Sequence, residues 1–252
     1  MKKTSFLFII LLFATAAFGA ADTDSLWIKG NDAYSMGEYD KALEDYSEIE
    51  QNGKISARLF YNIGNSYYKL NKTGKSILYY EKALKLDPSG KDIINNLEVA
   101  KLKTLDKIDT VPEFVMATWI KDLRNLMSSN NWAYLCLVFF LVTVLLLLLF
   151  KFAPNPGQRK VSFIMACLSI FVSVVLFLFS FSLYRNSVSE KYAIVTNSFS
   201  NVKSAPSTDG NNIFIIHEGT KVELLDKVGE WKRVELSDGR QGWILSSDIE
   251  II

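Results

Sequence analysis

The chain has 252 residues, a formal net charge of +1 and 49% hydrophobic residues. It therefore has neither the basic surplus typical of nucleic-acid binding nor the acidic surplus that would favour a cationic partner. Its two cysteines, Cys136 and Cys167, both lie inside long apolar runs, so a disulfide framework is not indicated. We expect them to be small apolar fillers, with a bridge between the two runs as the open alternative.

Residues 1–21 have the pattern of a signal peptide. Lys2 and Lys3 precede an apolar stretch at 6–13, and small residues follow from 14 to 21, with peptidase patterns at 17–19 and 19–21. The alternative is an uncleaved anchor helix. In both cases we expect the chain from residue 25 onward to lie outside the cytoplasm.

Residues 23–90 contain an internal repeat with a constant offset of 34 positions. The matched pairs are Gly30 and Gly64, Asn31 and Asn65, Tyr34 and Tyr68, and Tyr46 and Tyr80. Small residues stand where helices must approach closely, and Pro88 ends the second copy. This period and punctuation resemble the tetratricopeptide repeat.

The resemblance predicts an all-α tetratricopeptide array over residues 22–110. We expect repeats at 23–56 and 57–90, and a cap helix at 91–108, with a third degenerate repeat as the alternative for that last segment. One departure is visible, because Ser76 stands where the first repeat has Ala42.

In the tetratricopeptide family the first helix of each repeat lines a concave groove for an extended peptide or a partner helix. The resemblance places six residues there: Trp27, Asn31, Tyr34, Tyr61, Asn65 and Tyr68. The asparagines would hydrogen-bond a ligand backbone and the tyrosines would stack on side chains. The alternative for Tyr34 and Tyr68 is packing between helices. A clamp for a terminal carboxylate is not indicated, since Trp27 stands at one of the matching positions.

Residues 111–131 form an amphipathic connector. Val115, Trp119, Leu123 and Leu126 follow a helical spacing on one face, and charged residues fill much of the other. We expect this segment to lie flat at a membrane surface. The alternative is that it packs on the repeat domain.

Two apolar runs, 132–152 and 161–184, each exceed the length needed to cross a bilayer. They predict a two-helix transmembrane hairpin with a loop at 153–160. Lys151, Arg159 and Lys160 crowd this loop, as expected on the cytoplasmic side, and Trp132 and Tyr184 suit the opposite interface. The soluble domains would then share the periplasmic face of a bacterial inner membrane.

Residues 190–252 alternate short strands with turns. Strands are expected at 193–195, 213–216, 221–225, 231–236 and 241–245. The segments 201–210, 217–226 and 229–244 resemble a bacterial SH3-like domain, which implies a small all-β barrel. Lys203 matches the family's arginine only loosely. Trp231 is the candidate surface residue, and Trp243 is expected in the core.

The residues give no support for catalysis. His217 is the only histidine, which excludes a histidine dyad, and its HEGT context favours a solvated turn residue. No glycine-rich phosphate loop follows a strand. We therefore expect no enzyme activity, no metal and no cofactor.

The order of these parts makes a multidomain membrane protein, and it resembles the repeat-containing member of the Bat (aerotolerance) operon proteins. That resemblance implies partners among Bat membrane proteins with von Willebrand A-type domains, a link to a MoxR-type ATPase, and a role in oxidative-stress tolerance. The expected function is a non-enzymatic scaffold. The alternative is an envelope sensor or tether that binds peptidoglycan through the SH3-like domain.

Overall fold

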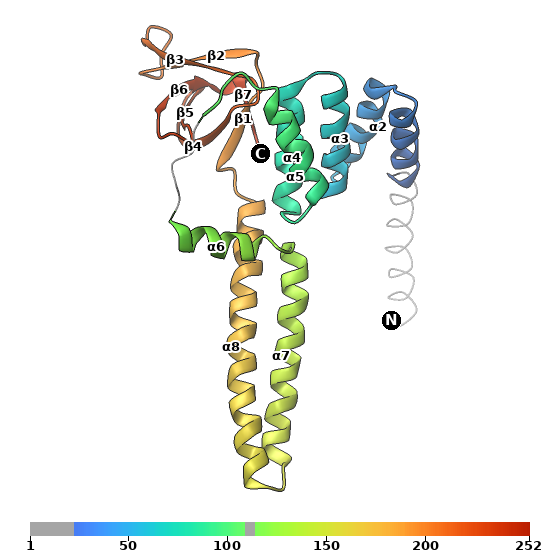
Figure 1. The fold of residues 1–252 in the computed structure, drawn as a ribbon. Coiled ribbons are helices and arrows are strands. Elements are labelled where there is room, and N and C mark those ends of the chain that lie inside the picture. Colours follow the sequence, from blue (N-terminus) through green and yellow to red (C-terminus); the bar gives the residue numbers. More distant parts are fainter. Residues whose placement is uncertain (1–22, 109–113) are drawn as a thin grey trace, which may run out of the picture. The chain divides into compact units, whose positions relative to one another are not determined.

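The computed structural model describes residues 23–108 and 114–252, and the expected signal peptide at 1–21 lies outside them (Figure 1). The described chain forms two compact units. The first combines the helical repeats up to Ala83 and residues 92–108 with the C-terminal sheet, Tyr192–Ile252. The second contains Leu84–Lys91 and residues 114–191.

The repeat region consists of helices joined by short turns. A first helix is described over residues 23–35. It is followed by α2 (Tyr39–Gln51), α3 (Ala57–Lys69), α4 (Thr73–Leu86) and α5 (Lys91–Leu102). Two helix pairs thus occupy the two expected repeats. The expected cap helix at 91–108 is helical only to Leu102, and the chain then continues without regular structure.

Glycine sets the spacing between the two helices of each repeat. A Cβ atom on Gly30 would lie 2.7 Å from the Tyr46 ring, and one on Gly64 would lie 2.7 Å from the Tyr80 ring. Both tyrosines are buried, so the rings have no room to retreat. Ser76 keeps the second pair equally close, because its buried hydroxyl donates to the Gly64 carbonyl at 2.9 Å. Serine at position 76 therefore allows the same close helix packing as Ala42 in the first repeat.

The turn inside each repeat uses a left-handed backbone. Gly37 has a φ of 81° after the first helix, and Asn71 has a φ of 56° at the same place in the second repeat, 34 positions later. Glycine and asparagine are the residues that adopt this conformation at a helix end with least strain. The sequence difference between Gly37 and Asn71 thus leaves the turn unchanged.

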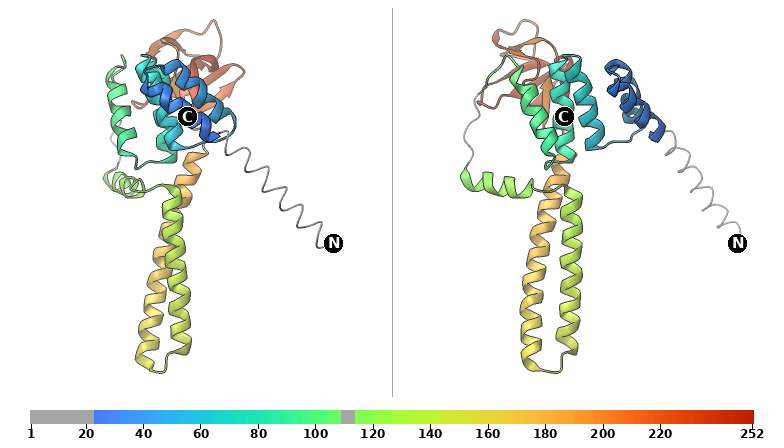
Figure 2. Two further views of the ribbon diagram at one scale, coloured as in Figure 1. Left: turned by 90° about the vertical axis from the view of Figure 1, so that its right-hand side faces the viewer. Right: turned by 45° about the vertical axis from the view of Figure 1, so that its right-hand side comes forward.

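The second unit is built on two long helices, α7 (Ser129–Phe152) and α8 (Pro156–Ser187), which run antiparallel and side by side (Figures 1 and 2). Both exceed the expected runs of 132–152 and 161–184. Pro156 begins α8, because proline suits the first helical turn. The connection is therefore limited to residues 153–155, shorter than the expected loop at 153–160, and Arg159 Nε donates to the Ala153 carbonyl at 2.9 Å.

Small and hydroxyl-bearing residues line the seam between α7 and α8. The Ser129 and Ser180 hydroxyls each donate to the other's carbonyl at 2.9 Å, and Ser169 donates to the Phe139 carbonyl at 2.9 Å. Cys136 Sγ lies 3.4 Å from the Ser173 hydroxyl. Both cysteines are free thiols, so no bridge joins the helices. Such close, hydrogen-bonded contacts are typical of helix pairs in an apolar medium.

The outward faces of α7 and α8 are apolar and exposed. Leu145, Leu148, Phe171 and Phe177 are among the many large hydrophobic side chains that nothing in the described chain covers. The two helices are long and apolar enough to cross a membrane by length and composition. Their exposure distinguishes them from the core helices of a soluble domain, which bury such residues.

The connector forms a single helix, α6 (Val115–Arg124), with no buried residue. Its C-terminal end is tied to the hairpin. The Trp132 indole donates to the Arg124 carbonyl at 2.8 Å, and Arg124 Nη1 donates to the Ser182 hydroxyl at 3.0 Å. Its apolar residues, including Trp119 and Ile120, are left exposed.

The C-terminal region is a seven-stranded antiparallel sheet with the order β3-β2-β6-β5-β4-β1-β7. Its strands are β1 (Tyr192–Val195), β2 (Phe199–Lys203), β3 (Asn212–His217), β4 (Lys221–Val228), β5 (Trp231–Glu235), β6 (Gln241–Leu245) and β7 (Ile249–Ile251). Five agree with the expected strands, and β2 and β7 are additional. Small aliphatic residues, including Val195, Val202, Val234 and Ile244, form the buried core.

We predict that Gly64→Ala destabilises the repeat region. The new methyl group must enter the space of the buried Tyr80 ring, and overpacking of this kind costs about 1–3 kcal/mol. The effect should appear as a lower midpoint for loss of helical signal in the detergent-solubilised chain.

Gly157→Ala is the matched control. It also lies in a helix, but apart from its chain neighbours and the backbone of its own helix no atom lies within 4 Å of its new Cβ. An unchanged midpoint for Gly64→Ala would show that the glycine is not required for the close approach.

Candidate functional site

The six candidate groove residues lie on the first helices of the two repeats. Trp27, Asn31 and Tyr34 belong to the first helix, and Tyr61, Asn65 and Tyr68 belong to α3. All six are half-buried. They therefore combine contacts inside the array with a solvent-facing edge.

The two asparagines form the centre of a repeated hydrogen-bond ladder. Asn31 Oδ1 accepts from the Tyr46 hydroxyl at 2.8 Å and from Asn62 Nδ2 at 3.1 Å. Asn65 Oδ1 accepts in the same way from the Tyr80 hydroxyl at 2.6 Å and from Asn96 Nδ2 at 2.9 Å. These oxygens are occupied by contacts that join successive repeats, so only the Nδ2 groups are left to meet a ligand backbone. Asn31 and Asn65 could therefore donate hydrogen bonds to a ligand backbone, but their oxygens are not free to accept hydrogen bonds from one.

The aromatic residues are held by their own repeats. The ring centroids of Trp27 and Tyr46 are 5.8 Å apart, those of Tyr61 and Tyr80 are 6.0 Å apart, and Tyr34 meets Tyr39 edge-on at 5.3 Å. Each ring thus has a fixed orientation, as a preformed binding surface requires.

Two cations lie over rings of this row. The Arg58 guanidinium is 5.1 Å from the Trp27 ring centroid, and Lys103 Nζ is 3.9 Å from that of Tyr68. Burial is the main cause that raises the pKa of Tyr34, so its phenol stays neutral and can donate a hydrogen bond at physiological pH. The row therefore offers aromatic faces, amide donors and positive charge.

The row continues on α5, which the sequence analysis did not include in the site. Asn95, Val99 and Leu102 stand 34 positions after Tyr61, Asn65 and Tyr68. With Glu98 and Lys101 they line a shallow depression, in which Val99 and Leu102 are exposed. The 34-residue period could have identified these positions, but their side-chain types do not repeat. We call the combined surface the first-helix row, which consists of Trp27, Asn31, Tyr34, Tyr61, Asn65, Tyr68, Asn95, Val99 and Leu102.

Trp243 is not part of the sheet core, contrary to the expectation. Side chains alternate along β6, and the buried positions are Gly242 and Ile244, whereas Trp243 is half-buried. Gly242 is required on the inner face, since a Cβ there would lie 2.4 Å from Val202 Cγ1. Because glycine occupies the core position, the neighbouring tryptophan points to the other face.

Trp231 and Trp243 share one face of the sheet. In the β5–β6 register Trp231 lies opposite Leu245 and Arg233 lies opposite Trp243, which gives both tryptophans the same parity. Lys203 lies opposite Trp243 on β2, and its Nζ is 5.6 Å from the Trp231 ring centroid. We call this surface the tryptophan face, formed by Trp231, Trp243 and Lys203.

His217 is not a solvated turn residue. It ends β3, and its Nδ1 lies 2.9 Å from Asp106 Oδ1 in the segment after α5. The local HEGT pattern correctly places a turn at the following residues but carries no information about a partner 111 positions away. Within the described residues, no group of three or more His, Cys, Asp or Glu side chains is arranged to hold a metal ion.

Comparison with known families identifies two parts of the chain. Residues 57–89 match the tetratricopeptide repeat and residues 198–250 match the bacterial SH3 domain. No curated protein matches the chain. The second predicted repeat and the predicted SH3 region are therefore confirmed, and both belong to families of binding modules.

We predict that Trp243→Ala and Ile244→Ala differ in their effect on the SH3 region. Ile244→Ala removes buried core volume and should cost about 2–5 kcal/mol. Trp243→Ala removes a half-buried outer side chain and should cost about 1 kcal/mol.

Protease resistance of the SH3 region in the full chain, measured over a denaturant series, gives both values. If Trp243→Ala lowers the free energy of unfolding as much as Ile244→Ala or more, Trp243 belongs to the core.

Proposed function

We propose that the protein is a non-enzymatic inner-membrane scaffold that presents peptide- and protein-binding modules in the periplasm. The observation that carries this proposal is the presence of a tetratricopeptide repeat and a bacterial SH3 region on either side of one exposed apolar hairpin. Because the hairpin is antiparallel, the chain enters and leaves it at the same end. Both modules then belong to the same side of the membrane.

The membrane assignment is supported by length, exposure and charge. The 24 residues of α7 span roughly 36 Å at about 1.5 Å per residue, enough for a hydrocarbon core of about 30 Å. Lys151, Arg159 and Lys160 gather at the connected end, which favours the cytoplasm for that end. The α6 helix, with its apolar residues exposed, suits the interface at the opposite end.

The first-helix row is the proposed partner site. Its preformed aromatic faces and amide donors suit an extended peptide, and Arg58 and Lys103 favour acidic side chains on it. A partner of this kind would be a segment of another membrane protein. By the resemblance to the repeat-containing member of the Bat operon proteins, the partners would be Bat proteins with von Willebrand A-type domains, in a complex linked to a MoxR-type ATPase and to oxidative-stress tolerance.

The test uses the tagged, detergent-solubilised full chain as bait in its own membrane extract. We expect the double variant Val99→Asp/Leu102→Asp to lose at least one von Willebrand A-type partner, because it places two acidic charges in an exposed apolar depression that must receive an acidic peptide.

The control is Ile55→Asp, which introduces one acidic charge at an exposed apolar position outside the first-helix row. It should retain every partner. Full retention by the double variant would reject the row as the partner site, and the absence of von Willebrand A-type proteins from all samples would reject the Bat assignment.

A second candidate function is an envelope sensor or tether that binds peptidoglycan. The tryptophan face favours it, since paired aromatic rings on a rigid sheet bind sugars and extended peptides alike. Co-sedimentation with purified sacculi distinguishes the candidates. The tether requires that the full chain co-sediments and that Trp231→Ala/Trp243→Ala does not.

A further inference from the structure

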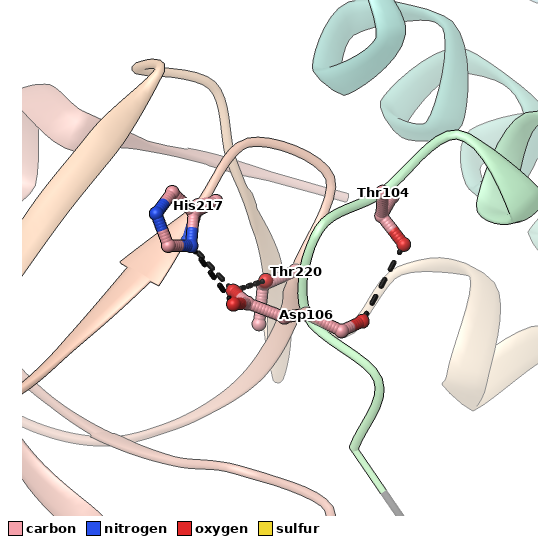
Figure 3. A network of polar contacts seen from close by, with 4 residues as sticks. All are labelled: Thr104, Asp106, His217 and Thr220. Carbon is pink, nitrogen blue, oxygen red and sulfur yellow. Dashed lines mark hydrogen bonds and ion pairs between the residues drawn. The ribbon is translucent and has the colours of Figure 1, made fainter.

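The first unit contains a polar junction between the repeat region and the SH3 region. It is formed by α4, by residues 104–108 after α5, and by the turn 218–220 between β3 and β4 (Figure 3). Of the site residues considered above, only His217 and Lys101 belong to it. The junction therefore requires an explanation separate from ligand binding.

Asp106 is the centre of the junction. Its carboxylate accepts three hydrogen bonds from the SH3 region: from the His217 backbone N–H at 2.7 Å, from the Thr220 hydroxyl at 2.7 Å, and at His217 Nδ1 at 2.9 Å (Figure 3). Ile108, two positions later, packs against the SH3 core. The chain after α5 is thus bound to the sheet by both polar and apolar contacts.

Glu81 makes a second connection from α4. Its side chain is only 9% exposed, which would be costly for an unpaired carboxylate. Two lysines satisfy it: Lys101 of α5 at 2.9 Å and Lys221 of β4 at 2.6 Å. One buried acid therefore joins two repeat helices to the SH3 sheet.

The backbones meet closely at two glycines. Gly219 has a φ of 87°, and a Cβ there would lie 2.7 Å from Thr104 Cγ2 and 2.8 Å from Ile77 Cδ1. The Gly74 N–H donates to Glu218 Oε2 at 3.0 Å, and Lys75 pairs with Glu250. Close packing over this length of α4 indicates a built interface rather than a chance contact.

The electrostatics agree with this geometry. Burial by itself would raise the pKa of both Asp106 and Glu81. The hydrogen bonds from Thr220 and His217 to Asp106, and the charges of Lys221 and Lys101 beside Glu81, outweigh it and lower both pKa values. Both groups are carboxylates at neutral pH, so the contacts are fully formed there.

The last repeat of the array also lacks its second helix. Asn96 of α5 repeats the ladder position of Asn62, 34 residues on, so α5 is the first helix of a third repeat. The described chain then leaves the helical pattern at Leu102 and reaches the SH3 region instead of forming a second helix. Solenoid arrays need a terminal element that covers the last exposed packing face.

We propose that the SH3 region is the C-terminal cap of the repeat array, docked on α4 and on residues 104–108 through its β3–β4 turn. The array and the SH3 region then open as one cooperative unit. The first-helix row and the tryptophan face are then held in a fixed relation to each other. This inference does not depend on the identity of any ligand.

Hydrogen–deuterium exchange of the detergent-solubilised full chain tests the cap. We expect Asp106→Ala to speed exchange about tenfold in α4, in α5 and in the turn 218–220 together, because it removes hydrogen bonds to a charged group. Asp209→Ala is the matched control, since it removes an exposed aspartate from the turn between β2 and β3 and should leave all three segments unchanged.

Thr220→Val keeps the shape of the side chain and removes a single hydrogen bond to Asp106. This variant replaces Asp106→Ala in the test if Asp106→Ala does not fold. It should raise the exchange rate by a smaller factor, about threefold, in the same three segments. Faster exchange confined to residues 104–108 and the turn, with α4 and α5 unchanged in either variant, would overturn the cap.

Discussion

The antiparallel packing of α7 on α8 is the constraint on which the other features depend. The chain leaves the repeat region, passes through more than sixty residues of connector and hairpin, and returns to supply the SH3 region. Ser129 and Ser180 hold the two helices together at the end where the chain enters and leaves. After this return the repeat region and the SH3 region share one compact unit, in which Asp106 contacts His217.

The two binding modules use aromatic residues in different ways. In the repeat region Tyr46 and Tyr80 are buried beside glycines and donate to the ladder asparagines, so they serve the array itself. Trp27, Tyr34, Tyr61 and Tyr68 are only half-buried and keep an edge toward solvent. In the sheet, Gly242 fills the core position and leaves Trp243 on the outside beside Lys203. Aromatic content alone therefore does not show which rings are buried, whereas the position of the neighbouring glycine does.

Local patterns account for the parts of the fold that could be predicted. The 34-residue offset of Gly30 and Gly64 predicts the helix pairs, and turn residues predict five of the seven strands. Strand β2 was not expected because it is mostly polar, and β7 was not expected because it has only 3 residues. The environment of His217 could not be predicted, because its partner Asp106 lies 111 positions away and no periodic pattern joins them. Similarly, the outward direction of Trp243 depends on which face of β6 each alternate side chain takes. The sequence does not show this, because the neighbours Ile244 and Leu245 are both apolar.

In the proposed topology, one hairpin presents both modules on the same side of a membrane. Site-specific labelling with a membrane-impermeant maleimide tests it in intact spheroplasts, with Cys136 and Cys167 replaced by serine. The account predicts that Ile55→Cys and Asp209→Cys are both labelled from outside, whereas Asn155→Cys, between α7 and α8, is labelled only after lysis. Labelling of Ile55→Cys and Asp209→Cys from opposite sides, or of Asn155→Cys from outside, would contradict it.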